Sequence, residues 1–288
     1  MKKALIFAAL LPLLFACNKD NSNKEIPTLP ATPKADYAIK VEAPASSGLA
    51  PAFHTLEFTG DGNYILEKNN GGEVIIETGK YDVELKDDDV IYLFLDKDAK
   101  ATLPKLTKAN EINITFTLNG ASFSGIVNLL NALGVDAFTL ATCRDWVVDD
   151  IDVSVEGNGF SFGKVYNGAC NLQTVATDLK AQGLNINPSD FAGYDVKSVE
   201  FTTYKSFKIQ FAAAPVYYGS FDGFAADGSF NYTFDGNDVG NSFISASSKG
   251  QVAWNNAKPS LTLKSVIKDS KNNKEYNSVI KLTLKKAN

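Results

Sequence analysis

Residues 55–67 read TLEFTGDGNYILE, and this stretch decides the fold class of the chain. Two runs that mix apolar and polar residues, Thr55–Phe58 and Asn63–Leu66, flank the turn-forming residues Gly60, Asp61 and Gly62. Short runs of this kind separated by Gly and Asp are typical of a β-hairpin. The stretch therefore predicts two antiparallel strands of a sheet that buries one face.

The same pattern continues on both sides of this hairpin. Further strands are predicted at Tyr37–Val41, Glu73–Ile76, Gly79–Val83, Val90–Leu95, Ile112–Phe116, Trp146–Val155 and at intervals over Val196–Leu284. The clearest later hairpin joins Ser260–Lys268 to Tyr276–Lys285. Many short strands with turn residues between them indicate a mainly β chain with antiparallel sheets.

Two segments have a helical period instead. Gly125–Leu133 follows Ser124, and Leu172–Gln182 follows Asn171, so that each begins after a residue that can cap a helix. A glycine ends each segment. The apolar residues at helical spacing are Ile126, Leu129, Leu130 and Leu133 in the first and Leu172, Val175 and Leu179 in the second. We expect two short helices that pack on a sheet.

The opening stretch has an internal match. Leu56–Thr59 (LEFT) corresponds to Val199–Thr202 (VEFT), and an aromatic residue lies six positions after the Phe of each. Further on, Gly79–Asp82 (GKYD) corresponds to Gly219–Asp222 (GSFD). Strand sequences resemble one another readily, so coincidence is one explanation. Two signatures in the same order favour a duplication, with related β units at 36–135 and 136–288.

A family resemblance follows from these motifs. Phe53–Val83 has an apolar-Glu-Phe-Thr strand, a Gly-Asp-Gly turn and a Gly-x-Tyr strand, and it resembles the meander of lipocalin-like (calycin-type) lipoproteins of gut Bacteroidetes. Thr142–Val148 is similar to the first strand of the same domains. The resemblance implies two tandem antiparallel lipocalin-like β-barrel or rolled-sheet units of about eight strands, with or without a ligand cavity. The helix expected within Asp150–Asp190 departs from that meander.

The first residues predict a destination for the chain. Lys2 and Lys3 precede the apolar run Ala4–Ala16 and then Cys17, a pattern that indicates a secretory signal and resembles a bacterial lipobox. An ordinary signal peptide with a chance cysteine is the alternative. We expect a signal peptide at 1–17, lipidation of Cys17 and a disordered tether at 18–35. Lys19 and Asp20 resemble an export signal to the cell surface, so we expect a membrane-anchored outer-membrane lipoprotein, with a periplasm-facing location as the alternative.

Composition and motifs exclude several function classes. The chain has 33 acidic and 28 basic residues and no basic stripe, which argues against nucleic-acid binding. His54 is the only histidine, no Gly-x-Ser-x-Gly motif occurs, and the acidic groups near Asp88 and Asp150 lack calcium-loop spacing. We therefore expect no catalytic residue, no metal and no cofactor, although paired carboxylates of a glycan hydrolase are not excluded by sequence.

Two cysteines remain after Cys17. Cys143 and Cys170 would close a loop of 27 residues, and an exported chain permits a disulfide between them. Two buried free thiols are the alternative. The only histidine is far away in sequence, which makes a metal site at these cysteines improbable.

Aromatic residues concentrate near the carboxyl end of the chain. The candidate ligand-binding residues are Tyr217, Tyr218, Phe230, Tyr232, Phe234 and Trp254. Strand alternation places Phe230, Tyr232 and Phe234 on one face, where they line a cavity, stack sugars or simply fill a small core. We expect a non-enzymatic, lipid-anchored envelope protein that binds a small apolar ligand in a β cavity. The alternatives are a surface glycan-binding protein, a glycan hydrolase or a purely adhesive protein.

Overall fold

The computed structural model describes residues 34–105, 110–168, 170–235, 243–255, 258–269 and 271–287. The fold is mainly β, with two tandem antiparallel eight-stranded closed barrels, as the sequence predicts, and two α-helices within these ranges. The predicted signal peptide, Cys17 and the tether up to residue 33 lie outside the described residues. No helix of the described part is long and apolar enough to cross a membrane.

The first barrel is an antiparallel meander that begins after a 3₁₀ turn, η1 (Ala35–Tyr37). Its strands are β1 (Ile39–Glu42), β2 (Thr55–Phe58), β3 (Asn63–Asn70), β4 (Glu73–Lys86), β5 (Asp89–Phe94), β6 (Ala99–Pro104), β7 (Glu111–Leu118) and β8 (Ala121–Leu130). Each strand pairs with the next, and β1 also pairs with β8, which closes the barrel.

The second barrel uses a longer sheet. Its strands are β9 (Asp145–Gly157), β12 (Asp195–Phe201), β13 (Ser206–Phe211), β14 (Tyr217–Phe221), β15 (Ser229–Phe234), β16 (Ser247–Asn255), β17 (Lys258–Asp269) and β18 (Lys274–Lys286). The sheet closes because β9 pairs with both β18 and β12. Two further strands, β10 (Phe160–Asn167) on β9 and β11 (Cys170–Asn171) on β12, extend it beyond the barrel.

The helices differ in part from the sequence-based expectation. The prediction at 172–182 is confirmed by α2 (Leu172–Ala181), where the Asn171 side chain accepts a hydrogen bond from the Thr174 amide. The helix predicted at 125–133 is wrong, because β8 occupies these residues and pairs with β7 and β1. The predicted apolar stripe is not buried, because Ile126 is 49% exposed, whereas the buried residue is Val127, which lies outside that stripe. A helix that the sequence did not predict, α1 (Ala137–Thr142), joins the barrels, and a 3₁₀ turn, η2 (Pro188–Phe191), follows α2.

The internal match reappears as the same strand register in both barrels. Phe58 pairs with Tyr64 as Phe201 pairs with Phe207. Tyr64 then pairs with Gly79 as Phe207 pairs with Gly219. Equivalent residues thus lie at equivalent sheet positions, which supports a duplication. The predicted units 36–135 and 136–288 each contain one of the barrels.

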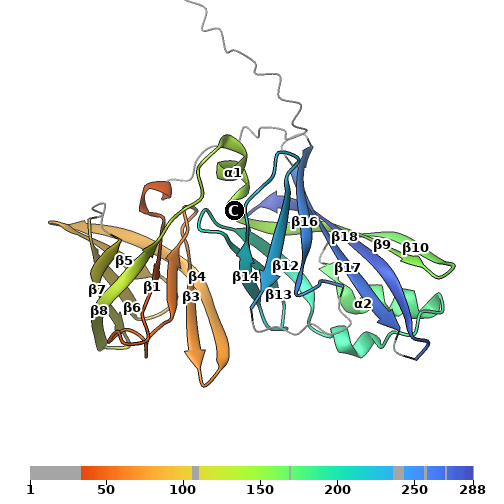
Figure 1. The fold of residues 1–288 in the computed structure, drawn as a ribbon, viewed down its shortest axis with the longest axis horizontal. Coiled ribbons are helices and arrows are strands. Elements are labelled where there is room, and N and C mark those ends of the chain that lie inside the picture. Colours follow the sequence, from red (N-terminus) through yellow and green to blue (C-terminus); the bar gives the residue numbers. More distant parts are fainter. Residues whose placement is uncertain are drawn as a thin grey trace, which may run out of the picture.

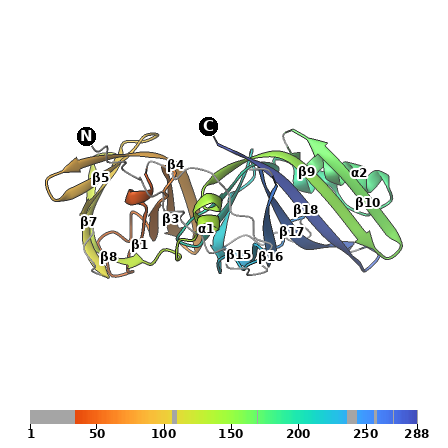
Figure 2. The same cartoon turned by 90° about the horizontal axis from the view of Figure 1, so that it is seen from above.

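Each barrel has its own apolar core. Aromatic rings fill the first, where Phe58 stacks on Tyr92 with ring centroids 4.0 Å apart. The barrels lie side by side along the longest axis, with α1 at their junction and α2 at the far end of the second (Figure 1). Figure 2 shows the same arrangement from above.

Candidate functional site

The six aromatic residues singled out in the sequence are buried in the second barrel. None is more than 7% exposed. Five of them, all but Tyr218, belong to one apolar cluster, in which the rings of Tyr232 and Phe234 lie 5.1 Å apart and Trp254 meets Trp146 at 5.6 Å. These five rings fill the core between the strands. Their role in ligand binding stays a prediction.

Tyr218 faces the other way, toward the first barrel. Its hydroxyl lies 3.1 Å from the ammonium nitrogen of Lys40 on β1. Tyr218 is therefore part of the junction between the barrels and not of the aromatic core.

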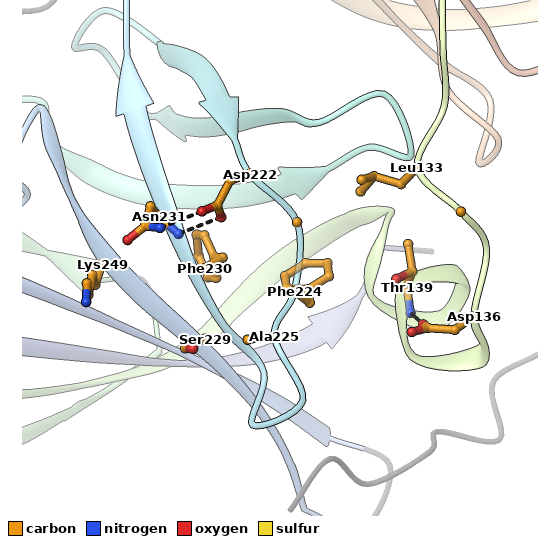
Figure 3. A pocket seen from close by; sticks show the side chains of 12 residues that line it. Leu133, Asp136, Thr139, Asp222, Phe224, Ala225, Ser229, Phe230, Asn231 and Lys249 are labelled. Atoms are coloured by element: carbon orange, nitrogen blue, oxygen red, sulfur yellow. Dashed lines mark hydrogen bonds between the residues drawn. The ribbon is translucent and has the colours of Figure 1, made fainter. Parts of the chain in front are cut away.

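A surface cleft of about 460 Å³ lies beside the core ring Phe230. One wall is the connection from β8 into α1, and the other is the loop after β14 together with the start of β15 (Figure 3). The lining residues are Leu133, Gly134, Asp136, Thr139, Asp222, Gly223, Phe224, Ala225, Ser229, Phe230, Asn231 and Lys249. A volume of this size suits a small ligand.

The apolar part of the cleft is built by rings that the core holds in place. Phe224 is partly buried and packs edge-on against Phe230, with centroids 5.6 Å apart, and against Phe138 of α1 at 5.4 Å. Phe230 occupies its position because Gly250 on the neighbouring strand has no side chain: a Cβ there would overlap the ring. The rings are thus fixed by the fold before any ligand arrives.

The polar part of the cleft is held by hydrogen bonds. Asp222 accepts from the backbone amide of Asn231 at 2.8 Å and from its side-chain nitrogen at 2.5 Å. Across the cleft, Asp136 caps α1 and accepts from the Thr139 amide at 2.7 Å. Exposed Lys249 is the third charged residue of the lining. Two carboxylates and one ammonium give the cleft an excess of one negative charge.

The junction of the barrels buries the two glutamates of the repeated motif. Glu57 and Glu200 are both 0% exposed. Glu57 lies 3.5 Å from Lys40 Nζ and accepts a hydrogen bond of 2.7 Å from Ser206 of the second barrel. Glu200 lies 2.6 Å from Lys208 Nζ, and the Asn63 amide nitrogen of the first barrel lies 3.4 Å from its Oε1.

Two carboxyl groups at the junction, those of Glu200 and Asp145, have raised pKa values. The pKa of Glu200 is raised to about 7, chiefly by burial; Lys208 opposes this rise, and the nearby carboxylates Asp61 and Asp145 add to it. Burial also raises the pKa of Asp145. Sequence reasoning marked Glu57 and Glu200 only as strand residues, because their partners are 149 and 137 residues away in the chain.

The remaining predicted residues do not converge on a site. His54 is 44% exposed and lies 3.8 Å from a carboxylate oxygen of Glu42. Cys143 has a free thiol whose pKa burial raises well above its ordinary value, while the side chain of Cys170 lies outside the described residues. Because the side chain of Cys170 is not described, the disulfide between Cys143 and Cys170 stays a prediction. Within the described ranges, no group of three or more His, Cys, Asp or Glu residues is arranged to hold a metal ion.

Sequence reasoning missed most of the cleft. Of its lining, only Phe230 was among the predicted ligand-binding residues. The others come from two loops, from α1 and from the strands β15 and β16, and their juxtaposition depends on how the second barrel closes. A signal was present in the turn residues around Asp222 and Gly223, which mark a loop next to an aromatic strand.

Comparison with known proteins gives little more. No protein-family model matches the chain, and no curated protein matches it in sequence. Among solved structures, it is similar to a double mutant of the vaccine antigen transferrin binding protein B from Haemophilus parasuis, with 10% identity and a TM-score of 0.26 over 82% of this chain. It is also similar to isotype 1 transferrin binding protein B from serogroup B Neisseria meningitidis, with 12% identity and a TM-score of 0.24 over 80% of this chain. The chain spans 54% and 52% of those proteins.

Proposed function

We propose that this chain is a lipid-anchored cell-envelope protein that binds a saccharide, without catalysis, in the cleft between α1 and β15. The anchor rests on the signal and lipobox pattern that ends at Cys17. The ligand class rests on one observation: the cleft combines a fixed aromatic ring with a carboxylate and an amide that share one wall.

A saccharide fits this combination of groups. Its hydroxyls donate hydrogen bonds, which Asp222 accepts with its remaining lone pairs, since an ionised carboxylate has about four acceptor sites. Its C–H face is apolar and lies against a ring such as that of Phe224. The excess negative charge of the cleft disfavours an acidic sugar, because the carboxylate of the sugar would face those of Asp136 and Asp222. A neutral or amino sugar has these hydroxyl groups and an apolar face, and it carries no negative charge.

Binding is favoured over hydrolysis by the tasks that the two carboxylates already have. Asp136 caps α1, and Asp222 fixes the start of β15 through two hydrogen bonds from Asn231. Both are engaged as acceptors of fixed N–H donors. The small apolar ligand that the sequence analysis placed among the six rings is less well supported, since those rings pack against one another.

The test is a glycan array probed with the protein, followed by calorimetry with the saccharide that binds. We expect binding of at least one neutral or amino saccharide, and a loss of affinity of about twofold to tenfold in the Phe224→Ala and Asn231→Ala variants, because stacking and hydrogen bonding each contribute about 0.5–1.5 kcal/mol. The matched control is Asn113→Ala on the first barrel, whose side chain is exposed on β7. An array without saccharide binding, or a Phe224→Ala variant with unchanged affinity, would contradict the proposal.

A further inference from the structure

A second pocket lies on the first barrel, at the open end beside η1. Its volume is about 240 Å³, and its lining is mostly apolar: Asp36, Tyr37, Ile39, Leu85, Val90, Tyr92, Leu103, Pro104 and Lys105. Ile39, Tyr92 and Leu103 form a buried base, each no more than 2% exposed. The Tyr92 hydroxyl is occupied by a hydrogen bond of 3.0 Å to the Tyr37 carbonyl, so it offers no competing donor to a ligand.

This pocket shares two lining positions of the repeat with the cleft in the second barrel. Tyr81 pairs with Phe94 as Phe221 pairs with Tyr232. Counting four residues on from Tyr81 and from Phe221 makes Leu85 the counterpart of Ala225, and each lines its pocket.

The opposite strand gives the same equivalence. Counting two residues back from Phe94 and from Tyr232 makes Tyr92 the counterpart of Phe230, and both line their pockets. One further part of the lining is similar, because it comes from the helical turn that precedes the first strand of the barrel: η1 before β1, and α1 before β9. The rest differs, since Leu103 and Pro104 line the first pocket while Ser229, Asn231 and Lys249 line the cleft. The two pockets thus overlap in repeat position without having the same lining.

The chemistry of the two copies has diverged. In the first barrel, Leu85 stands where the second has Ala225, and Val90 stands where it has Gly228. These larger side chains narrow the pocket and make it apolar. The counterpart of Asp222 is Asp82, which pairs with Lys34 at 3.2 Å and does not line the pocket. The charged groups of the lining are Asp36 and Lys105.

We propose that this pocket is a second binding site, which takes a small neutral apolar ligand such as a short alkyl chain. Three observations carry it: the apolar lining, the exposure of Leu85 and the two lining positions that the pocket shares with the cleft. A dry apolar cavity of about 150 Å³ already holds a ring such as benzene, so the pocket is large enough. Leu85 is 55% exposed in the structure and would be covered by the ligand, which removes apolar surface from water. A charged ligand would lose its hydration against the buried base without a partner there.

The test uses octan-1-ol as the probe and methyl NMR of the full mature chain as the measurement. We expect saturable shifts of the Leu85, Val90 and Leu103 methyl signals. Leu85→Glu should weaken binding tenfold or more, because it places a charge in the wall. The matched control is Leu95→Glu: Leu95 is 63% exposed and outside the lining, so this variant should bind octan-1-ol as the parent chain does.

The outcomes separate this proposal from saccharide binding. Absence of saturable shifts in the parent chain would overturn the apolar site, and so would equal binding by the Leu85→Glu variant. The cleft variant Phe224→Ala should leave the octan-1-ol affinity unchanged. Failure of the saccharide test therefore leaves the apolar site standing, and failure of the octan-1-ol test leaves the cleft standing.

Discussion

Glu200 is the residue whose environment makes the clearest prediction. Its buried carboxyl faces Lys208 on β13, Asn63 and Asp61 from the first barrel, and Asp145 on β9. Burial and the two aspartates raise its pKa from 4.5 to about 7, so the folded protein holds this proton more tightly than the unfolded chain does. The stabilisation of the folded protein by this bound proton is complete below pH 4.5 and is lost as the pH rises through 7.

The free energy of unfolding should therefore fall between pH 5 and pH 8. The loss is as much as about 3 kcal/mol, since one pKa unit corresponds to about 1.4 kcal/mol. Glu200→Gln removes the titrating group and should flatten the profile. Urea denaturation at pH 5 and at pH 8 measures the free energy of unfolding. The control is Glu156→Gln, on the exposed side of β9. A profile as steep in Glu200→Gln as in the parent chain would assign the pH dependence to other groups.

At the scale of single elements, equivalent glycines are required in both barrels. Gly79 and Gly219 occupy the same register position opposite Tyr64 and Phe207. A Cβ at Gly79 would approach the Tyr64 ring to 2.6 Å, and one at Gly219 would overlap the Thr233 carbonyl of β15. Neither strand tolerates a side chain at this point.

Gly219→Ala should destabilise the protein by about 1–3 kcal/mol, because overpacking forces the backbone of β14 and β15 apart. The control is Gly163→Ala in β10, where a Cβ would meet nothing within 4 Å and the change should stay within about 0.5 kcal/mol. Chemical denaturation compares the two. Equal effects of the two substitutions would mean that β14 can shift without cost.

The elements also show which parts of the fold can be predicted from the sequence. The hairpin at 55–67 and α2 are local structures: their turns, caps and apolar periods lie within a few neighbouring residues, and both predictions are confirmed. The helix prediction over β8 overlooked a local signal, since β8 forms a hairpin with β7 across Asn119 and Gly120. Its closure onto β1, which is about ninety residues earlier in the chain, has no local signal. Barrel closure is a non-local contact, and a local apolar period does not report it.

The same argument applies to the candidate sites. The aromatic strand at 229–234 could be found from its alternation, but alternation does not say whether a ring faces a core or a cavity. The cleft requires α1 to lie beside the loop at Asp222, and the junction requires Ser206 to reach Glu57. Such contacts depend on how the barrels sit together, which no window of sequence contains.

At the scale of the whole molecule, the contacts between the two barrels are related by approximate twofold symmetry. Asn63 and Ser206 are equivalent positions of the repeat, and each faces the buried glutamate of the opposite barrel, Glu200 and Glu57. Reciprocal contacts of this kind are typical of a symmetric homodimer interface. Further bonds cross the junction: the Asp145 amide donates to Asp61 at 2.7 Å, and the Tyr204 hydroxyl donates to the Ala38 carbonyl at 2.7 Å.

An interface of this kind should hold the barrels together without the covalent connection. A protease site inserted between the exposed residues Gly134 and Val135 allows the chain to be cut after folding. We expect the two halves to co-elute in gel filtration at neutral pH, because the buried ion pairs and hydrogen bonds of the junction do not involve the cut segment. Halves that separate at micromolar concentration would show that the connection, and not the junction, keeps the barrels paired.

The contacts that carry this association can be identified with the cut chain. Ser206→Ala leaves the buried Glu57 carboxylate without its donor from the second barrel, which costs about 1–3 kcal/mol and should make the halves separate at higher concentration than the parent. Asn63→Ala removes the equivalent contact, which is longer at 3.4 Å, and should have a smaller effect. Ser220→Ala, an exposed serine on β14, serves as the control. The outcome that would contradict this is a Ser206→Ala chain whose halves separate at the same concentration as those of Ser220→Ala. The twofold-related contacts would then not be what holds the barrels together.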